Sequence, residues 1–262
     1  MKTLTINISI VLALMVCLTT SCEKVVDINL NDSNPQLVIE ATIVSDGTPC
    51  NVRITKTVNF DATNNFPTVD NALVSLNDDA GNTENLQLTS SGLYKSSVMT
   101  GVEGRKYTLS VNVDGKNYIA ISTLPIKTNL DSLWVDSLSF FGSTTYTVTP
   151  QYKDSFGVKN TYRFKLFVNG MVDKTIFVDD DEFNDGRTVS RPYFGDIKIE
   201  TGDTLRWQMM CIDKAIYRYF FSLLTVQDGS SGAPANPVSN FSGGCLGYFS
   251  AHTLQEKMIT VN

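Results

Sequence analysis

The stretch KYTLSVNVDGKNYIAIS, residues 106–122, decides the fold class of this chain. From Tyr107 to Val113 every second residue is apolar, which is the period of a half-buried β-strand. Asp114-Gly115 follows. Asp-Gly between two alternating runs indicates a two-residue hairpin, because a type I′ turn needs positive φ at both positions. The stretch therefore predicts two antiparallel strands joined by a tight turn.

Runs with the same period lie on both sides of this hairpin. LVIEATIV begins at Leu37, VRITKTV at Val52 and NALVSLND at Asn71. Strand signals at intervals of about 8 to 12 residues, without a helical period, are typical of an antiparallel sandwich. Residues 36–125 are thus predicted to form an N-terminal Ig-like or transthyretin-like β-sandwich.

A second β-rich domain is predicted over residues 126–262. It contains the hairpin YRFKLFV-NG-MVDKTIFV, with its turn at Asn169-Gly170. DKAIYRYFFSLLTVQ, from Asp213 to Gln227, instead has apolar residues at helical spacing. Asp213 is placed to cap the first turn. We expect a mainly β protein with one amphipathic helix at about 213–227.

The N-terminus resembles a bacterial lipoprotein signal peptide. Ile8 to Leu18 is a nearly unbroken apolar run of 11 residues, too short for the roughly 20 apolar residues that cross a bilayer. The pattern LTTSC that follows resembles a lipobox, which predicts cleavage between Ser21 and Cys22 and lipidation of Cys22. An ordinary signal peptide, with Cys22 a free or paired thiol, is the alternative. Residues 1–21 are then the signal peptide and residues 22–35 a polar tether.

Composition and charge narrow the classes of partner. Removal of residues 1–21 takes away one Lys, so the formal net charge moves from −6 to about −7. No basic patch is visible, which disfavours nucleic acid as a partner. A chain that is 42% hydrophobic and 10% aromatic is typical of a folded body.

The sequence offers little that indicates catalysis. His252 is the single histidine, so any site of the Ser/His/Asp or Cys/His kind has to use it. Neither a GxSxG nor an HExxH pattern is present. We therefore expect no enzymatic activity and no cofactor.

The cysteines after Cys22 are Cys50, Cys211 and Cys245, an odd number without close spacing. This pattern excludes a disulfide framework and a CxxC metal pair. An oxidising compartment permits one bridge, for which Cys211 and Cys245 are the candidates. The alternative is that all three are small buried side chains.

The densest acidic stretch is DDDEFNDG, residues 179–186. Its Asp179, Asp181 and Asp185 are a weak candidate Ca²⁺ site, since Ca²⁺ prefers hard oxygen ligands. Phe183 stands where an EF-hand loop starting at Asp181 needs an oxygen ligand. A solvated turn between strands is therefore the competing interpretation.

Some surface features have both a functional and a structural interpretation. Phe140-Phe141 and Tyr193-Phe194 lie next to glycines and are candidate loop aromatics for ligand stacking, although a β core also needs aromatic residues. Three Asp-Ser/Thr-Leu triplets resemble a short O-glycosylation sequon, and their candidate acceptors are Ser132, Ser137 and Thr204.

Several stretches together resemble one family, the Bacteroidota lipoproteins known as domain of unknown function 4249. They are CEKVVDINL, PQLVIEATIV, GLYKSSVMTGVEGRKYTLSVNVDGKNYIAISTLP, DDDEFNDG, GDTLRWQMMCIDKAIYRYFFSL and SNFSGGCLGYFSAHT. The resemblance implies no catalytic or binding residues. It does imply a genetic association with TonB-dependent outer-membrane receptors.

Two functional hypotheses follow. The first is a non-enzymatic lipoprotein, anchored to the outer membrane through Cys22, that captures ligand for a TonB-dependent receptor or docks onto it. The second is a structural or adhesive surface protein, such as a component of a pilus or matrix. The sequence identifies neither a ligand nor the side of the membrane that the protein faces.

Overall fold

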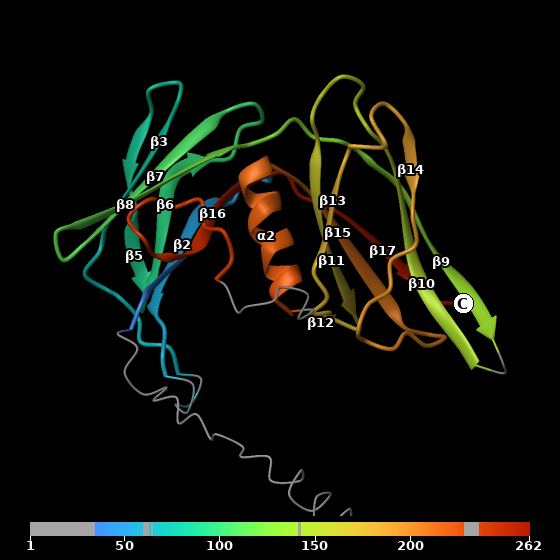
Figure 1. Cartoon of the computed structure of the whole chain (residues 1–262). Coiled ribbons are helices and arrows are strands. Elements are labelled where there is room, and N and C mark those ends of the chain that lie inside the picture. Colours follow the sequence, from blue (N-terminus) through green and yellow to red (C-terminus); the bar gives the residue numbers. More distant parts are fainter. Residues whose placement is uncertain (1–34, 60–62, 64, 141–142, 228–235) are drawn as a thin grey trace, which may run out of the picture. The chain divides into compact units, whose positions relative to one another are not determined.

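The computed structural model describes residues 35–59, 63, 65–140, 143–227 and 236–262. The predicted signal peptide, the lipobox and nearly all of the predicted tether lie outside these residues. In the described part the prediction of a mainly β protein with one helix is confirmed (Figure 1).

The strands and the helix have the following bounds: β1 (Leu37–Val44), β2 (Pro49–Lys56), β3 (Leu73–Asp78), β4 (Thr83–Asn85), β5 (Gln87–Ser90), β6 (Leu93–Thr100), β7 (Lys106–Val113), β8 (Lys116–Thr123), β9 (Leu130–Phe140), β10 (Ser143–Lys153), β11 (Thr161–Val168), β12 (Met171–Val172), β13 (Phe177–Asp180), β14 (Thr188–Ser190), β15 (Thr204–Ile212), α2 (Lys214–Gln227), β16 (Leu246–His252) and β17 (Gln255–Thr260).

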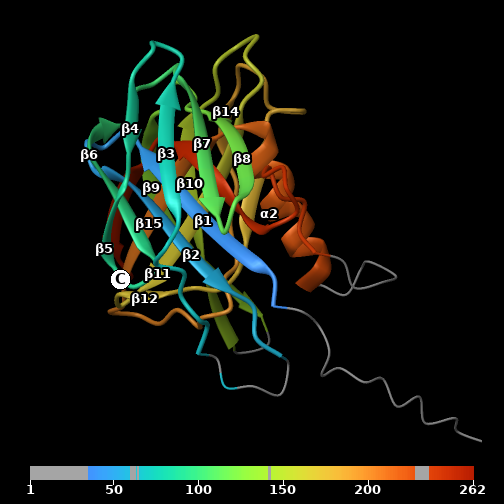
Figure 2. The ribbon, with the colours of Figure 1, turned by 90° about the vertical axis from the view of Figure 1, so that its left-hand side faces the viewer.

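The predicted hairpin at residues 106–122 is present as β7 and β8. Its turn residues Asp114 and Gly115 have φ values of 51° and 80°, as a tight turn of this kind requires. β7 and β8 belong to a sheet of order β4-β3-β7-β8, and Figure 2 shows β3, β7 and β8 beside one another. The alternating residues of β7 point into the core, where Tyr107, Leu109 and Val111 are fully buried.

The second sheet of this first sandwich has the order β16-β1-β2-β6-β5. Its outermost strand β16 comes from the far end of the sequence and pairs in parallel with β1. Phe249 and Ala251 of β16 lie in the same core as Ile39 and Ile43 of β1. The predicted boundary, which assigned all of residues 126–262 to a separate domain, therefore needs correction. An alternating strand does not reveal by itself which distant strand it joins.

The second sandwich has a sheet of order β14-β10-β9 and a sheet of order β12-β11-β15-β17, with β13 also pairing to β11. Its core is aromatic. Trp207 is fully buried, and its ring centroid lies 5.3 Å from that of Phe164 and 5.1 Å from that of Tyr193. The hairpin predicted at Asn169-Gly170 is confirmed as the β11–β12 turn, with φ values of 50° and 83°.

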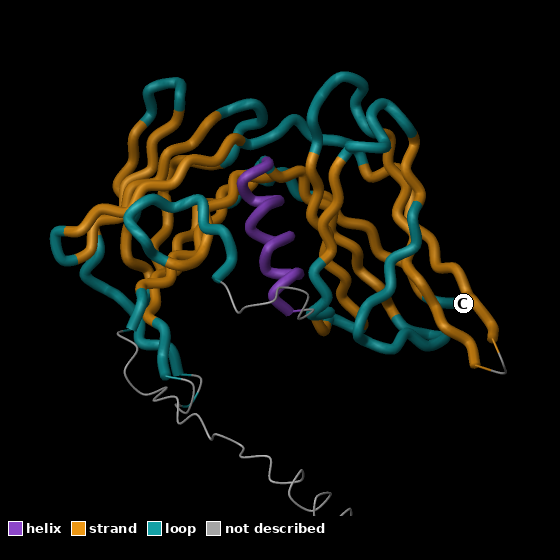
Figure 3. Tube along the Cα trace, viewed as in Figure 1, coloured by secondary structure: helices purple, strands orange, loops and turns teal. Residues whose placement is uncertain are grey.

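Helix α2 packs against β11 and β13 of the second sandwich and against β16 of the first, and Figure 3 shows it between the two groups of strands. Its buried residues Ile216 and Phe220 form a small core with Met210 and Ile212. Asp213 caps the helix as predicted, because its Oδ1 accepts a hydrogen bond from the Ile216 N–H at 3.0 Å.

The other carboxylate oxygen of Asp213 ties the helix to the first sandwich. Its Oδ2 accepts a hydrogen bond from the Ser122 hydroxyl at 2.6 Å and one from the Thr123 N–H at 3.0 Å, both on β8. The same residue therefore begins the helix and holds it to a strand far earlier in the sequence.

Candidate functional site

The acidic stretch at residues 179–186 divides into two parts in the structure. Asp179 forms an ion pair with Arg191 and accepts a hydrogen bond from the Tyr193 hydroxyl at 3.3 Å. Asp181 and Asp185 turn instead toward Asp154, and ligand atoms of these three lie within 4.8 Å of one another. The predicted trio is thus not assembled as such, since Asp154 takes the place of Asp179.

Strand pairing brings Asp154 to this position. β10 pairs with β14, so that Lys153 lies opposite Thr188, and the Asp154 N–H donates to the Arg187 carbonyl at 2.9 Å. The loop after β10 and the loop after β13 therefore lie side by side. No local pattern around Asp154 indicates this contact, because the partner residues are about 30 positions away in the sequence.

The three carboxylates already accept hydrogen bonds from the chain. Asp154 accepts from the Asn160 side-chain amide at 3.1 Å, from the Tyr162 hydroxyl and from the Gly186 N–H at 3.2 Å. Asp181 accepts from the Asn160 N–H at 3.0 Å, and Asp185 accepts from the Gly157 N–H at 2.7 Å.

These bonds fasten the two loops to each other. Ca²⁺ normally takes six to eight oxygen ligands, and here three carboxylates are oriented toward loop donors. The arrangement therefore favours a structural role of these carboxylates over Ca²⁺ binding.

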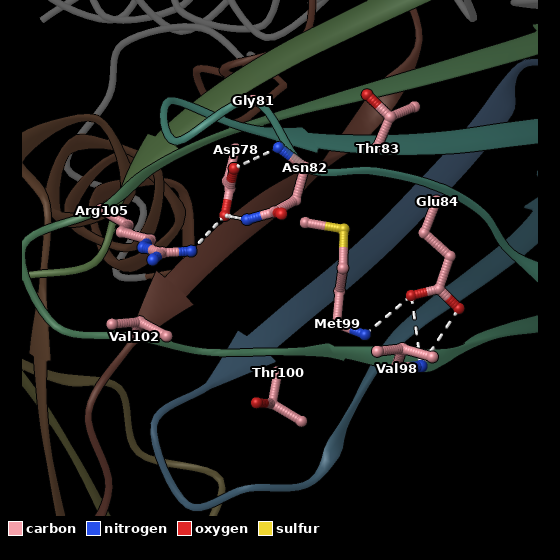
Figure 4. Close-up of a pocket in the computed structure, with 10 residues that line it drawn as sticks. All are labelled: Asp78, Gly81, Asn82, Thr83, Glu84, Val98, Met99, Thr100, Val102 and Arg105. Atoms are coloured by element: carbon pink, nitrogen blue, oxygen red, sulfur yellow. Dashed lines mark hydrogen bonds and ion pairs between the residues drawn. The ribbon is translucent and has the colours of Figure 1, made fainter.

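A surface hollow of about 670 Å³ lies between the β3–β4 hairpin and β6 (Figure 4). On one wall the Glu84 carboxylate accepts hydrogen bonds from three consecutive N–H groups, those of Ser97, Val98 and Met99, the last at 2.7 Å. Partial burial opposes ionisation of Glu84, but these bonds outweigh it and lower the pKa of the carboxyl group.

The opposite wall carries a second internally paired carboxylate. Asp78 accepts hydrogen bonds from Asn82 and forms an ion pair with Arg105. Burial opposes ionisation here too, and the Asn82 and Arg105 bonds overcome it, so the pKa of Asp78 is lowered. With both carboxylates paired, the open lining includes Val98, which is 82% exposed, and Val102. The hollow therefore fits an uncharged or amphipathic ligand better than a free ion.

His252 is buried at the end of β16, and its Nδ1 lies 2.9 Å from the Ser250 hydroxyl. Burial, with Arg163 and Lys165 nearby, lowers the pKa of His252 to about 4. The imidazole is therefore neutral at neutral pH. Although a serine and a histidine are adjacent, both side chains are buried away from solvent.

The structure has Cys50, Cys211 and Cys245 as free, buried thiols. Cys211 lies in the core of the second sandwich and Cys245 in the core of the first, so the candidate Cys211–Cys245 bridge is not formed. Burial raises the pKa of Cys50 to about 12 and that of Cys245 to about 11. This arrangement agrees with the alternative interpretation as small buried side chains.

The candidate surface residues are placed differently from one another. Tyr193 is a core residue, whereas Phe194 is 54% exposed. Phe140 ends β9, and Phe141 lies outside the described residues. Among the candidate glycosylation sites Ser137 is exposed, and Ser132 and Thr204 are half-buried.

Three further findings concern membranes and relatives. Within the residues that the structure describes, no helix has the length and apolar character needed to cross a membrane. A comparison with curated proteins found no match. The sequence model of the family described as "Domain of unknown function (DUF4249)" matches residues 23–258, which is most of the chain. The chain therefore belongs to the DUF4249 family.

Proposed function

We propose that the mature protein is a non-enzymatic lipoprotein of the outer membrane, anchored through Cys22, that captures ligand for a TonB-dependent receptor or docks onto it. The pattern Leu18-Thr19-Thr20-Ser21-Cys22 carries the proposal, because it combines an apolar run, small residues and a cysteine. Residues 22–35 are the predicted tether, and β1 begins shortly after them at Leu37. Acyl chains contribute about 0.8 kcal/mol per buried methylene, so a multiply acylated cysteine holds the protein at the membrane.

The chemistry of the described residues supports a binding role over catalysis. The single histidine is neutral and buried, and the thiols of Cys50, Cys211 and Cys245 have raised pKa values. Neither group is therefore activated as a nucleophile or as an accessible base. The hollow beside Glu84 is the candidate capture site, since it is open and its charged groups are already paired.

Replacement of the proposed lipid site tests the anchor. Cys22→Ala should move the protein from the membrane fraction to the soluble fraction, with an unchanged circular dichroism spectrum. Asn31→Ala, in the tether, is the matched control and should stay with the membrane. Retention of Cys22→Ala in the membrane fraction refutes the lipid anchor.

Affinity purification from outer membranes tests the receptor. The anchored protein should co-purify with a TonB-dependent receptor barrel. If repeated purifications contain no receptor barrel, that part of the proposal is refuted. A strain that lacks the protein distinguishes the receptor hypothesis from the adhesive alternative. Loss of adhesion or surface assembly with intact nutrient uptake favours a structural surface protein.

A further inference from the structure

Strand β9 is a sheet edge. β17 of the facing sheet lies beside part of it, and at its start the Leu130 N–H donates to the Gln255 side chain at 3.0 Å. β9 is the last strand of the sheet β14-β10-β9, and its side chains from Asp136 to Ser139 are all exposed. Among them is the large apolar side chain of Leu138, which is 58% exposed. In Figure 1, β9 and β10 run together toward their tip as a two-stranded ribbon. A two-stranded ribbon is marginally stable in water, and a third strand stabilises it.

The register shows which backbone groups of β9 are free. Val135 lies opposite Val148 of β10. The N–H of Val148 donates to the Tyr193 carbonyl at 3.2 Å, and the Val148 carbonyl accepts from the Tyr193 N–H at 2.9 Å. Val148 therefore turns its backbone groups away from β9. Val135 and Val148 form a non-hydrogen-bonded pair, in which both residues direct N–H and C=O outward.

Hydrogen-bonded and non-hydrogen-bonded pairs alternate along an antiparallel ladder, so every second residue of β9 on either side of Val135 also directs its backbone groups outward. Leu133 lies opposite Pro150, which has no N–H to donate, so this pair is also non-hydrogen-bonded. Ser137, two residues beyond Val135, likewise directs its backbone groups outward. Within the described residues, the N–H groups of Leu133, Val135 and Ser137 have no hydrogen-bond partner outside their own sheet.

From Asp136 to Ser139, where every side chain is exposed, the edge lacks the features that normally block pairing with another chain. Natural edge strands are protected by lysines, prolines, bulges or covering elements. No Lys or Arg occurs between Leu130 and Thr149, and residues 137–149 contain no charge. The register irregularity of the pair lies at Gln151/Tyr152, near the base of the ribbon and away from Ser137. An edge left open in this way is typical of proteins that accept a strand from a partner.

We propose that the β9 edge from Leu133 to Ser139 receives an extended segment of a partner protein as an added β-strand. The only charges on β9 are those of Asp131 and Asp136, so the segment carries Lys or Arg beside apolar residues at alternate positions. A second copy of this chain is the poorer occupant, because each copy has a formal net charge of −6, or about −7 without residues 1–21. This inference names the docking surface for the proposed function and rests on it for the identity of the partner.

Substitution of Ser137 tests the edge directly. Ser137→Pro removes an outward N–H and leaves the ladder to β10 intact, since proline is compatible with a solvent-facing edge position. Ser137→Ala is the matched control, because it keeps the N–H and removes only the hydroxyl. The probe is a synthetic peptide that alternates valine with lysine or threonine, and the control peptide has glutamate in place of lysine.

The mature wild-type protein and Ser137→Ala should bind the lysine peptide. Ser137→Pro should bind it about tenfold more weakly, which corresponds to the loss of one hydrogen bond of about 1.4 kcal/mol. Hydrogen exchange should show new protection of the Val135 and Ser137 N–H groups in the bound state. The N–H groups of Asp136 and Leu138, which face β10, should be protected in both states.

Four results of the peptide-binding and hydrogen-exchange measurements overturn the proposal. They are no binding of the lysine peptide to wild type, equal binding to Ser137→Pro, equal binding of the glutamate peptide, and protection of Val135 that depends on protein concentration together with dimer formation. The last result assigns the edge to a second copy. Recovery of the receptor equally by wild type and Ser137→Pro leaves the proposed function standing and refutes the edge. Recovery by neither refutes the proposed receptor, while the peptide measurement still decides whether the edge accepts a strand.

Discussion

Acidification from pH 7 to pH 5 should destabilise the protein mainly through His252. The folded-state pKa of this residue is about 4, below the ordinary value of about 6.5. Between pH 6.5 and pH 4 the His252 imidazole is protonated in the unfolded chain but neutral in the native protein. The free energy of unfolding therefore falls as the pH falls. The slope approaches about 1.4 kcal/mol per pH unit, which gives a loss of about 2 kcal/mol between pH 7 and pH 5.

Between pH 7 and pH 5 the change in stability comes mainly from the protonation of one side chain, His252. His252 is the only histidine, and the carboxylates with lowered pKa values, such as Asp78 and Glu84, lose their contribution only as the pH falls through and below their ordinary values of about 4. Lowered carboxyl pKa values therefore add further acid destabilisation below about pH 5 and little above it.

Urea unfolding at pH 7, 6 and 5, followed by tryptophan fluorescence, measures the effect, because Trp207 is fully buried in the native state. The variant His252→Gln removes the titrating group. Its absolute stability is lower, but its free energy of unfolding should change by less than about 0.5 kcal/mol across the same pH range. Parallel pH dependence of wild type and variant refutes the assignment to His252.

Three other predictions follow from the hydrogen bonds. Glu84→Gln should lower the free energy of unfolding by about 2 kcal/mol, because a charge-assisted acceptor for three N–H groups is lost, whereas the exposed Thr83→Ala should change it little. Asp213→Ala should cost about 1 to 2 kcal/mol through loss of the helix cap and of the bonds to β8, with Lys214→Ala as the neighbouring control; equal melting of the two variants contradicts this. Millimolar Ca²⁺ should leave the melting temperature unchanged, and an increase that Asp181→Asn abolishes contradicts the structural role of the carboxylates.

Local patterns predicted most elements of this fold. The alternation in β7 and the Asp114-Gly115 turn are consequences of neighbouring residues, and so is the helical spacing after Asp213. The parallel pairing of β16 with β1 was not predictable in this way, because it joins strands about 200 residues apart. The same reason explains why Asp154 was missed beside Asp181. A local sequence can show that a carboxylate lies in a turn, but strand pairing decides which second turn lies against it.

The placement of β16 also bears on how an anchored protein withstands force. With the proposed lipid at Cys22, a pull on the body enters the fold through residues 22–35 and reaches β1 first. β1 is not an edge strand: it pairs with β2 on one side and with β16 on the other, where Val38 to Val44 match Leu246 to His252. A force along β1 therefore loads both ladders in shear, so that many hydrogen bonds share it.

This arrangement makes β16, from the C-terminal part of the chain, necessary for a complete first sandwich. Without β16, β1 would become an edge strand and the core residues Ile39 and Ile43 would lose their contact with Phe249 and Ala251. The strand that returns from the end of the sequence thus secures the strand nearest the tether. Residues 36–125 alone therefore do not make a complete sandwich, because β16 supplies one strand of its sheet and part of its core.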